Sequence, residues 1–527
     1  MTATPPDPLA LLRSKSYVAI LILAAIVGVP VSAAAYFFLA LVDKLQGWIF
    51  TSLPNGLGFD GEPLWWPIPP LLLAGVLVAL SIRYLPGKGG NSPADGFHAG
   101  EGPPSSIELP GILLAALATL SLGVVLGPEG PMIALGAGLG ALAVRLVKRD
   151  APARVQSVLA AAGSFAAIST LLGSPLTGAF LLMEASGLGG PTLGLVLVPG
   201  LLAAGVGSLI FIGLDAWTGL GTFSLAIPGL PAVGAPTGAE FLWALAIGAL
   251  AVPVGIGIRW LGLFLRPHVE RRLLLLTPMA GLAIAGLAIA YASATGKSSS
   301  DVLFSGQSDL GPFIANSASY SVGAVLMLIA CKGLAYGVSL SSFRGGPTFP
   351  AIFLGSAGGV ALSHLPGLPL VHGVAMGIGA MAVVMLRLPL TSVLLATLLL
   401  ASDGLAVMPL VIVSVVVAVL SSALPRAQMK PWNNAGLTGP PAATSAPAPR
   451  RDLSGVWDAG QGGIQPTGYN VAALFTPLGA KTAGANKPGN GPRIGDVSED
   501  NDPLSTLGDP AGFPRIVLYE LRPFEIV

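Results

Sequence analysis

The chain has 527 residues, of which 53% are hydrophobic and only 10% are charged. Soluble domains carry about 25% charged residues, and no soluble fold hides this much apolar sequence from water. The formal net charge of +1 indicates neither a nucleic acid nor an acidic partner. Cys331 is the only cysteine, which excludes an intramolecular disulfide.

Long uncharged runs recur along the chain, and each approaches or exceeds the roughly 20 residues that a helix needs to span a bilayer. These runs are Tyr17–Val42, Val155–Met183, Ala185–Leu214, Phe241–Ile258, Leu273–Gly296 and Leu405–Pro425. The sequence therefore predicts an all-α polytopic membrane protein whose surroundings are the lipid bilayer. Residues 1–15 lack the apolar region and cleavage site of a signal peptide, so we expect the first span to be retained.

Basic residues gather at three places in the chain: Arg13 and Lys15; Arg145, Lys148, Arg149 and Arg154; and Arg259, Arg266, Arg271 and Arg272. Positively charged loops stay in the cytoplasm. We therefore expect both termini and both later clusters on the cytoplasmic side of the plasma membrane.

A glycine-rich break, Pro86–Pro93, separates two apolar segments and reads Pro-Gly-Lys-Gly-Gly-Asn-Ser-Pro. A break of this kind at membrane depth either lines a polar cavity or forms a simple turn. Its composition alone leaves both interpretations open.

Glu129 is the only formal charge between Leu109 and Val144, and it lies in the segment Gly-Pro-Glu-Gly-Pro at 127–131. A carboxylate in so apolar a run marks a functional site by default. Pro131 favours a helix start, whose free N–H groups and positive dipole end attract an anion. That anion is either the carboxylate itself or a dissolved one.

The same pattern occurs a second time, 219 residues later. Residues 346–355 match residues 127–136 as G-P-x-x-P-x-I-x-L-G, and Pro-Leu-Thr at 175–177 recurs at 389–391. The two matching pairs of segments occur in the same order and at nearly the same separation along the chain. They predict an internal duplication. Many secondary transporters place such repeats so that broken helices meet near the midplane of the membrane.

Glu184 is the only formal charge between Val155 and Leu214. It either ends a helix at the cytoplasmic surface or has a buried role, and the sequence leaves both open. The four histidines show no ligand spacing, so we expect neither a metal nor another cofactor. No Ser/His pair or paired aspartates lie within the spans, which argues against an enzyme.

Three parts are expected along the chain. They are a cytoplasmic lead over residues 1–15, a membrane domain over 16–424 with halves at about 16–214 and 236–424, and a C-terminal tail over 425–527. Residues 430–515 are rich in Gly, Pro, Ala, Asn and Asp, which indicates disorder. Pro514–Leu521 is the one stretch of the tail that reads as a strand.

These motifs resemble the CLC family of chloride channels and chloride/proton antiporters. Residues 127–131 are similar to the family's G-(K/R)-E-G-P segment, and residues 343–350 to its G-x-F-x-P segment. The two Pro-Leu-Thr segments match the proline-led helices that follow in each half of the family. The resemblance covers roughly residues 15–424.

The resemblance implies an inverted-repeat helical bundle, a homodimer, and an anion pore in each protomer. Glu129 would be the gating glutamate, and its protonation would release it from the anion site. The remaining anion-binding positions that the resemblance implies are Gly89, Gly90, Gly127, Gly130, Gly346, Thr348 and Phe349.

Three departures from the family pattern bear on function. Gly89 stands where the family has a pore serine, so that Asn91 or Ser92 could serve only in a reshaped loop. Ala185 stands where the antiporters have an inner proton-transfer glutamate, which leaves Glu184 as the nearby substitute for a proton relay. No tyrosine follows residue 424 to take the place of the family's pore tyrosine.

The leading hypothesis is therefore chloride transport through a glutamate-gated pore, by a channel or a weakly proton-coupled exchanger. Export of fluoride or another anion is an alternative within transport. A non-transporting membrane protein with a degenerate fold is the alternative from another class.

Overall fold

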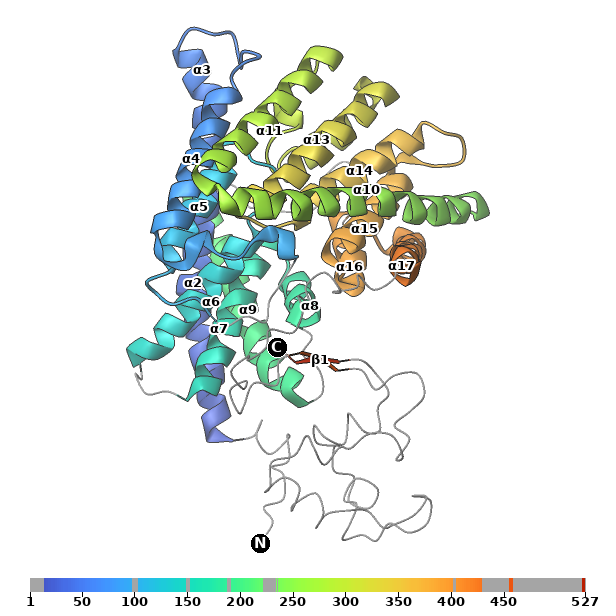
Figure 1. Cartoon of the computed structure of the whole chain (residues 1–527). Helices are drawn as coiled ribbons and strands as arrows, with labels where there is room; N and C mark the ends of the chain where they lie inside the picture. The colour runs from blue at the N-terminus through green and yellow to red at the C-terminus, as the bar shows by residue number, and fades with distance from the viewer. Residues whose placement is uncertain are drawn as a thin grey trace, which may run out of the picture. The chain divides into compact units, whose positions relative to one another are not determined.

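The computed structural model describes residues 14–96, 103–147, 152–186, 191–220, 234, 236–400, 404–428, 455–457 and 524–526. The chain divides into two compact units, Met1–Lys430 and Pro431–Val527. The described part of the first unit is helical (Figure 1). The predicted strand at Pro514–Leu521 lies outside the described residues.

The helices of the first half occupy residues 15–218. They are α2 (Lys15–Gly47), α3 (Leu53–Gly56), α4 (Ile68–Tyr84), α5 (Leu109–Ser121), α6 (Glu129–Val147), α7 (Ala153–Leu172), α8 (Pro175–Ser186) and α9 (Pro191–Thr218). A π-helical turn (Trp48–Ser52) joins α2 to α3, and two 3-10 turns (Pro86–Gly89 and Pro93–Asp95) separate α4 from α5.

The helices of the second half occupy residues 238–428. They are α10 (Gly238–Arg271), α11 (Leu273–Thr295), α12 (Leu310–Ala315), α13 (Val322–Ser342), α14 (Thr348–Ser363), α15 (Leu370–Leu386), α16 (Pro389–Leu399) and α17 (Gly404–Gln428). Two 3-10 turns (Ser299–Asp301 and Ser317–Ser319) flank α12.

The two halves repeat one order of long and short helices. Each begins with a long helix, of 33 residues in α2 and 34 in α10, and each contains a short proline-led helix, of 12 residues in α8 and 11 in α16. In Figure 1 the helices α6 to α9 lie below and to the left of α13 to α17, while α11 of the second half packs beside α4 of the first.

Within the described residues, eight helices are long and apolar enough to cross a membrane. The shorter apolar helices include α8, α14 and α16, which is the pattern of interrupted helices in transporters. Many large apolar side chains face outward, among them Trp260 at 63% exposure on α10. Such a surface is stable in lipid and not in water.

Glycines let the repeated helix pairs cross at backbone contact. A side chain on Gly136 of α6 would strike the carbonyl of Gly163 on α7, and one on Gly355 of α14 would strike that of Gly377 on α15. The two crossings occupy equivalent places in the two halves. Small residues at such crossings are the usual way in which membrane helices approach closely.

Several sequence boundaries need correction. Arg259 and Arg266, expected in a cytoplasmic loop, lie within α10, because that helix continues to Arg271. The polar segment at 297–317 contains the helix α12. The last membrane helix, α17, continues to Gln428, beyond the expected limit at residue 424.

The described residues of the second unit form one short antiparallel pair of strands. These are β1 (Gly455–Trp457) and β2 (Phe524–Ile526), with Gly455 opposite Ile526 and Trp457 opposite Phe524.

Candidate functional site

The starts of α6 and α14 are held together by a two-residue bridge between the halves. The amide of Gly127 donates to the carbonyl of Gly346 at 2.8 Å, and the amide of Gly346 donates to the carbonyl of Gly127 at 2.6 Å. A Cβ atom at either glycine would overlap the Glu129 carboxylate. The duplicated glycines therefore serve the close approach of two backbones and one carboxylate.

Glu129 lies at the centre of this junction and is fully buried. Its Oε1 accepts a hydrogen bond from the amide of Phe349, in the first turn of α14, at 2.9 Å. Its Oε2 is enclosed and has no hydrogen-bond partner among the described residues. The carboxylate of one half thus occupies the N-terminal end of the broken helix of the other half, which is an anion-binding position.

Thr348 provides a second polar group at this helix end. Its side chain is fully buried, and its Oγ1 has no hydrogen-bond partner within the described part of the chain. The preceding residue, Pro347, has no N–H to offer an anion. The available donors at the start of α14 are therefore the Thr348 hydroxyl and the first amides of the helix.

The structure corrects three of the predicted anion-binding positions. The amides of Gly127 and Gly346 donate to each other's carbonyls, and the amide of Gly90 donates to the carbonyl of Gly87 at 2.7 Å. An amide that is already bonded in this way has no hydrogen left for a dissolved anion. These glycines shape the site rather than bind the ligand. Gly130 likewise lies against the backbone of Gly345.

Gly89 and Gly90 belong to a turn in the left-handed region of backbone conformation, with φ of 72° and 87°. Side chains added there would contact Ala115 at Gly89 and Ile112 at Gly90, both on α5, and Arg344 at Gly89. The glycine-rich break therefore lies beside the segment that leads into α14. The turn packs closely against α5 and against the stem of Arg344.

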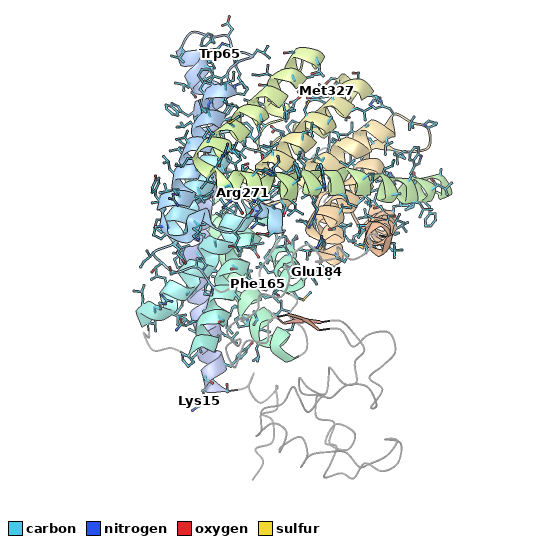
Figure 2. All side chains as sticks on the ribbon, in the orientation of Figure 1. Lys15, Trp65, Phe165, Glu184, Arg271 and Met327 are labelled. Atoms are coloured by element: carbon cyan, nitrogen blue, oxygen red, sulfur yellow. The ribbon has the colours of Figure 1, made fainter. Side chains whose placement is uncertain are left out.

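Glu184 lies where α8 approaches α16 (Figure 2). Its carboxylate accepts hydrogen bonds from the amides of Leu390 and Thr391 at 2.9 and 2.7 Å, and from the Thr391 hydroxyl at 2.6 Å. It thus caps the first turn of a helix from the other half, where a negative charge is favourable. Glu184 therefore fits neither predicted alternative, because its side chain is half-buried and is bound by another helix.

Three residues that sequence reasoning passed over surround the junction. The Tyr336 hydroxyl donates to the carbonyl of Pro347 at 2.6 Å and holds the residue before α14 in place. Arg344 lies two residues before the bridge, and Lys332 is fully buried in α13. The signal for the last two was a charge inside an apolar stretch, the same signal that singled out Glu129.

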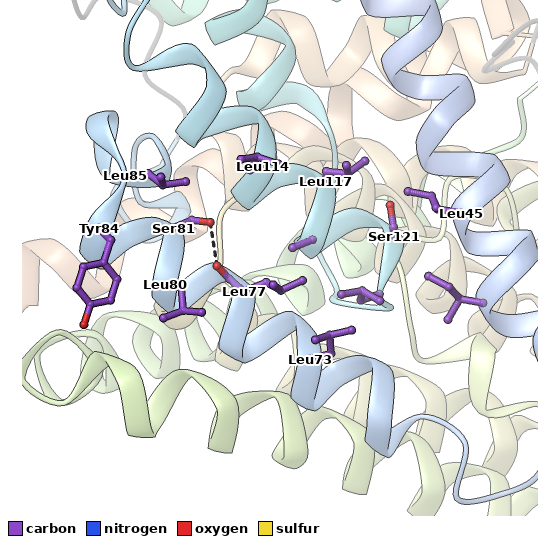
Figure 3. Close-up of a pocket in the computed structure, with 13 residues that line it drawn as sticks. Leu45, Leu73, Leu77, Leu80, Ser81, Tyr84, Leu85, Leu114, Leu117 and Ser121 are labelled. Atoms are coloured by element: carbon purple, nitrogen blue, oxygen red, sulfur yellow. Dashed lines mark hydrogen bonds between the residues drawn. The ribbon is translucent and has the colours of Figure 1, made fainter.

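An apolar pocket lies elsewhere, among α2, α4 and α5 (Figure 3). Leucines dominate its lining, and its polar groups include Ser81 and Ser121. The Ser81 hydroxyl donates to the carbonyl of Leu77 at 2.8 Å, the dashed line in the figure. This lining suits hydrocarbon rather than an anion. Among the described residues no three His, Cys, Asp or Glu side chains group closely enough for a metal ion.

Comparisons with known proteins agree with this geometry. A family model described as "Voltage gated chloride channel" matches residues 71–423. A relative from Escherichia coli O1:K1 / APEC, named "Putative ion-transport protein YfeO", is 30% identical over 386 residues, which cover 71% of this chain and 86% of the relative.

Two solved structures share the fold. The crystal structure of a slow cyanobacterial Cl−/H+ antiporter aligns with a TM-score of 0.63 at 19% identity, over 77% of this chain and 94% of that one. That of a CLC-type fluoride/proton antiporter aligns with a TM-score of 0.53 at 20% identity, over 77% and 96%. At these identities the likeness shows a shared architecture.

Proposed function

The chain belongs to the voltage gated chloride channel family, and from this premise we propose that Glu129 is the gate of its anion pathway. The family and the helical membrane fold that the motifs predicted are both confirmed. The protein is thus a multi-pass membrane protein of anion transport. The roles of individual residues are the substance of the proposal.

One observation carries the proposal: the Glu129 carboxylate accepts the hydrogen bond of the Phe349 amide at 2.9 Å. A permeating anion needs that same donor, because the broken helix offers few others. The side chain and the anion therefore compete for one position. A side chain that occupies the binding site of the transported ion acts as a gate.

Protonation of Glu129 opens the gate. A neutral carboxyl group loses the attraction to the positive ends of α6 and α14, and its O–H no longer suits an N–H donor. An anion then replaces it against the Phe349 amide and the Thr348 hydroxyl. The unpartnered Thr348 Oγ1 supports this step, since a buried hydroxyl without a partner has a donor to offer a ligand.

Chloride is the proposed substrate. The donors at the junction are backbone amides and one hydroxyl, which suit any small monovalent anion. Pro131 keeps the last proline of the G-x-E-G-P pattern, from which the fluoride-selective branch of the family departs. We place the protein in the plasma membrane as a homodimer, which the resemblance implies. The basic clusters support placing both termini in the cytoplasm.

Anion efflux from proteoliposomes, measured across pH, tests the gate. Wild-type protein should pass chloride faster as the pH falls, because protonation frees the site. Glu129→Gln, which resembles the protonated side chain, and Glu129→Ala should both give efflux that is independent of pH. Chloride and fluoride are compared at equal gradients in the same preparation.

Efflux by either Glu129 variant with the wild-type pH dependence would remove Glu129 from the mechanism. Faster fluoride than chloride efflux would assign the pathway to the alternative substrate. Folded wild-type protein without anion efflux at any pH would support the non-transporting alternative.

A further inference from the structure

Arg344 forms no direct ion pair with a carboxylate within the described residues. Its side chain is part-buried, and its Nε is enclosed and has no hydrogen-bond partner there. One of its terminal nitrogens donates to the carbonyl of Phe343 at 3.1 Å, a neutral acceptor. A guanidinium in such surroundings retains its charge and most of its donors.

The nearby acidic groups are engaged by other partners. Asp95 and Glu270 both form ion pairs with Arg266, the latter pair at 2.7 Å. The Glu108 carboxylate, which lies near Gly87, accepts the amide of Ser105 at 2.7 Å. Arg266 thus forms the direct ion pairs with Asp95 and Glu270, and Arg344 forms none with a carboxylate among the described residues.

Arg344 also lies between the glycine-rich turn and the gate. Its aliphatic stem lies next to Gly89, where an added Cβ would be 3.2 Å from Cγ. Two residues further along the chain, Gly346 forms the bridge beside Glu129. Ser92, at the end of the turn, has an enclosed Oγ without a hydrogen-bond partner among the described residues.

This arrangement lies on one identifiable side of the junction. Asp95 of the second 3-10 turn binds Arg266 of α10, so the turn lies near the basic end of that helix. The positive-inside rule assigns this end, with Arg271 and Arg272, to the cytoplasm. Arg344 therefore belongs to the inner approach to Glu129.

We propose that Arg344 is an anion-binding residue of the inner approach, where its guanidinium receives a small monovalent anion before the anion reaches the gate. This inference rests on the proposed pathway through the junction. A fixed charge also concentrates anions at the entrance of a low-dielectric path.

A purely structural role for Arg344 predicts different behaviour. The hydrogen bond to Phe343 could serve only to shape the segment before α14. In that case charge is irrelevant, and lysine is no better than glutamine as a replacement. In the binding role, lysine keeps the charge and glutamine does not.

The test compares chloride efflux by Arg344→Gln, Arg344→Lys and wild type in proteoliposomes, over a range of chloride concentrations. Arg83→Gln is the matched control, because Arg83 is exposed at the end of α4 and lies outside the site. Arg344→Gln should raise the half-saturating chloride concentration about tenfold or more, the scale of one lost charge-assisted hydrogen bond. Arg344→Lys should have a half-saturating concentration close to that of wild type, and that of Arg83→Gln should equal it.

A wild-type half-saturating concentration in Arg344→Gln, or equal losses in the glutamine and lysine variants, overturns the inference. Crystals of the full chain grown in bromide give an independent measurement, with an anomalous peak expected beside Arg344 in wild type and absent from Arg344→Gln. No peak in wild type counts against the site. If Glu129 variants lose pH dependence while Arg344→Gln behaves as wild type, the gate stands and only this inference fails.

Discussion

Thr348 and Glu129 each leave one buried oxygen atom without a hydrogen-bond partner in the described structure, at the start of the same helix. An unsatisfied buried polar group costs about 1–3 kcal/mol, so a folded protein rarely keeps one without a reason. Binding of a ligand is such a reason. In the proposed gate, these two atoms at the start of α14 are where an anion would replace the carboxylate.

Thr348→Val tests this interpretation of the hydroxyl. Valine keeps the shape of the side chain and removes only the donor. Because the hydroxyl makes no hydrogen bond of good geometry among the described residues, we expect thermal stability in detergent to be close to that of wild type. Chloride efflux should show a half-saturating concentration raised roughly five- to tenfold, the scale of one hydrogen bond to a charged ligand.

Ser356→Ala is the matched control, because Ser356 also has a buried hydroxyl without a partner among the described residues and lies two turns further along α14. Its efflux should equal that of wild type. An unchanged half-saturating concentration in Thr348→Val, or an equal change in both variants, would contradict a role for Thr348 in anion binding.

At the scale of elements, the molecule is organised by contacts between equivalent helices of the two halves. The bridge joins the starts of α6 and α14, and Glu184 of α8 caps the start of α16. Each contact places an acidic side chain of the first half at a helix N-terminus of the second. The two carboxylates differ in burial, since Glu129 is fully buried and Glu184 is half-buried.

Glu184→Gln separates a structural cap from a proton relay. Glutamine keeps one acceptor oxygen and turns an NH2 group toward amides that need an acceptor, so we expect a loss of about 1 kcal/mol of stability. Thermal unfolding in detergent should show a lower melting temperature. The pH dependence of anion efflux should stay as in wild type.

The opposite pattern would assign Glu184 to proton transfer: unchanged melting temperature together with altered proton movement. Thr391→Val should lower the melting temperature less than Glu184→Gln does. It removes one of the three donors to Glu184 and leaves the carboxylate intact.

At the scale of the whole molecule, the question is whether anion movement is coupled to protons. The antiporters of the family that the sequence resembles use an inner glutamate where this chain has Ala185. Glu184, beside it, is held by three donors of α16. Both of its carboxylate oxygens are engaged by these donors, which suits a helix cap better than a proton relay.

We therefore expect weak or no proton coupling. In proteoliposomes with a chloride gradient and no initial pH gradient, chloride should flow without sustained uphill movement of protons, as followed with a pH-sensitive dye. Glu129→Ala serves as the control, because it lacks the gating carboxylate and should show no proton movement that depends on the gate. Sustained uphill proton movement in wild type would instead make the protein an exchanger.

The sequence alone determined the membrane class, the duplication, the family and the residue at the centre of the junction. It could do so because each of these is recorded locally. Apolar runs of sufficient length show the spans, the repeated motif shows the duplication, and an isolated carboxylate in an apolar run stands out whatever surrounds it.

The tertiary structure decided what each polar group binds. The sequence could not show that the amides of Gly127 and Gly346 bond to each other, that Glu184 caps α16, or that Arg266 takes the carboxylates near Arg344. Lys332 stood out as a charge in an apolar stretch, but only the structure shows that its ammonium donates to the carbonyls of Asp301, Val302 and Leu303. Hydrogen bonds between segments distant in sequence depend on how the two halves pack, and no local pattern records that packing.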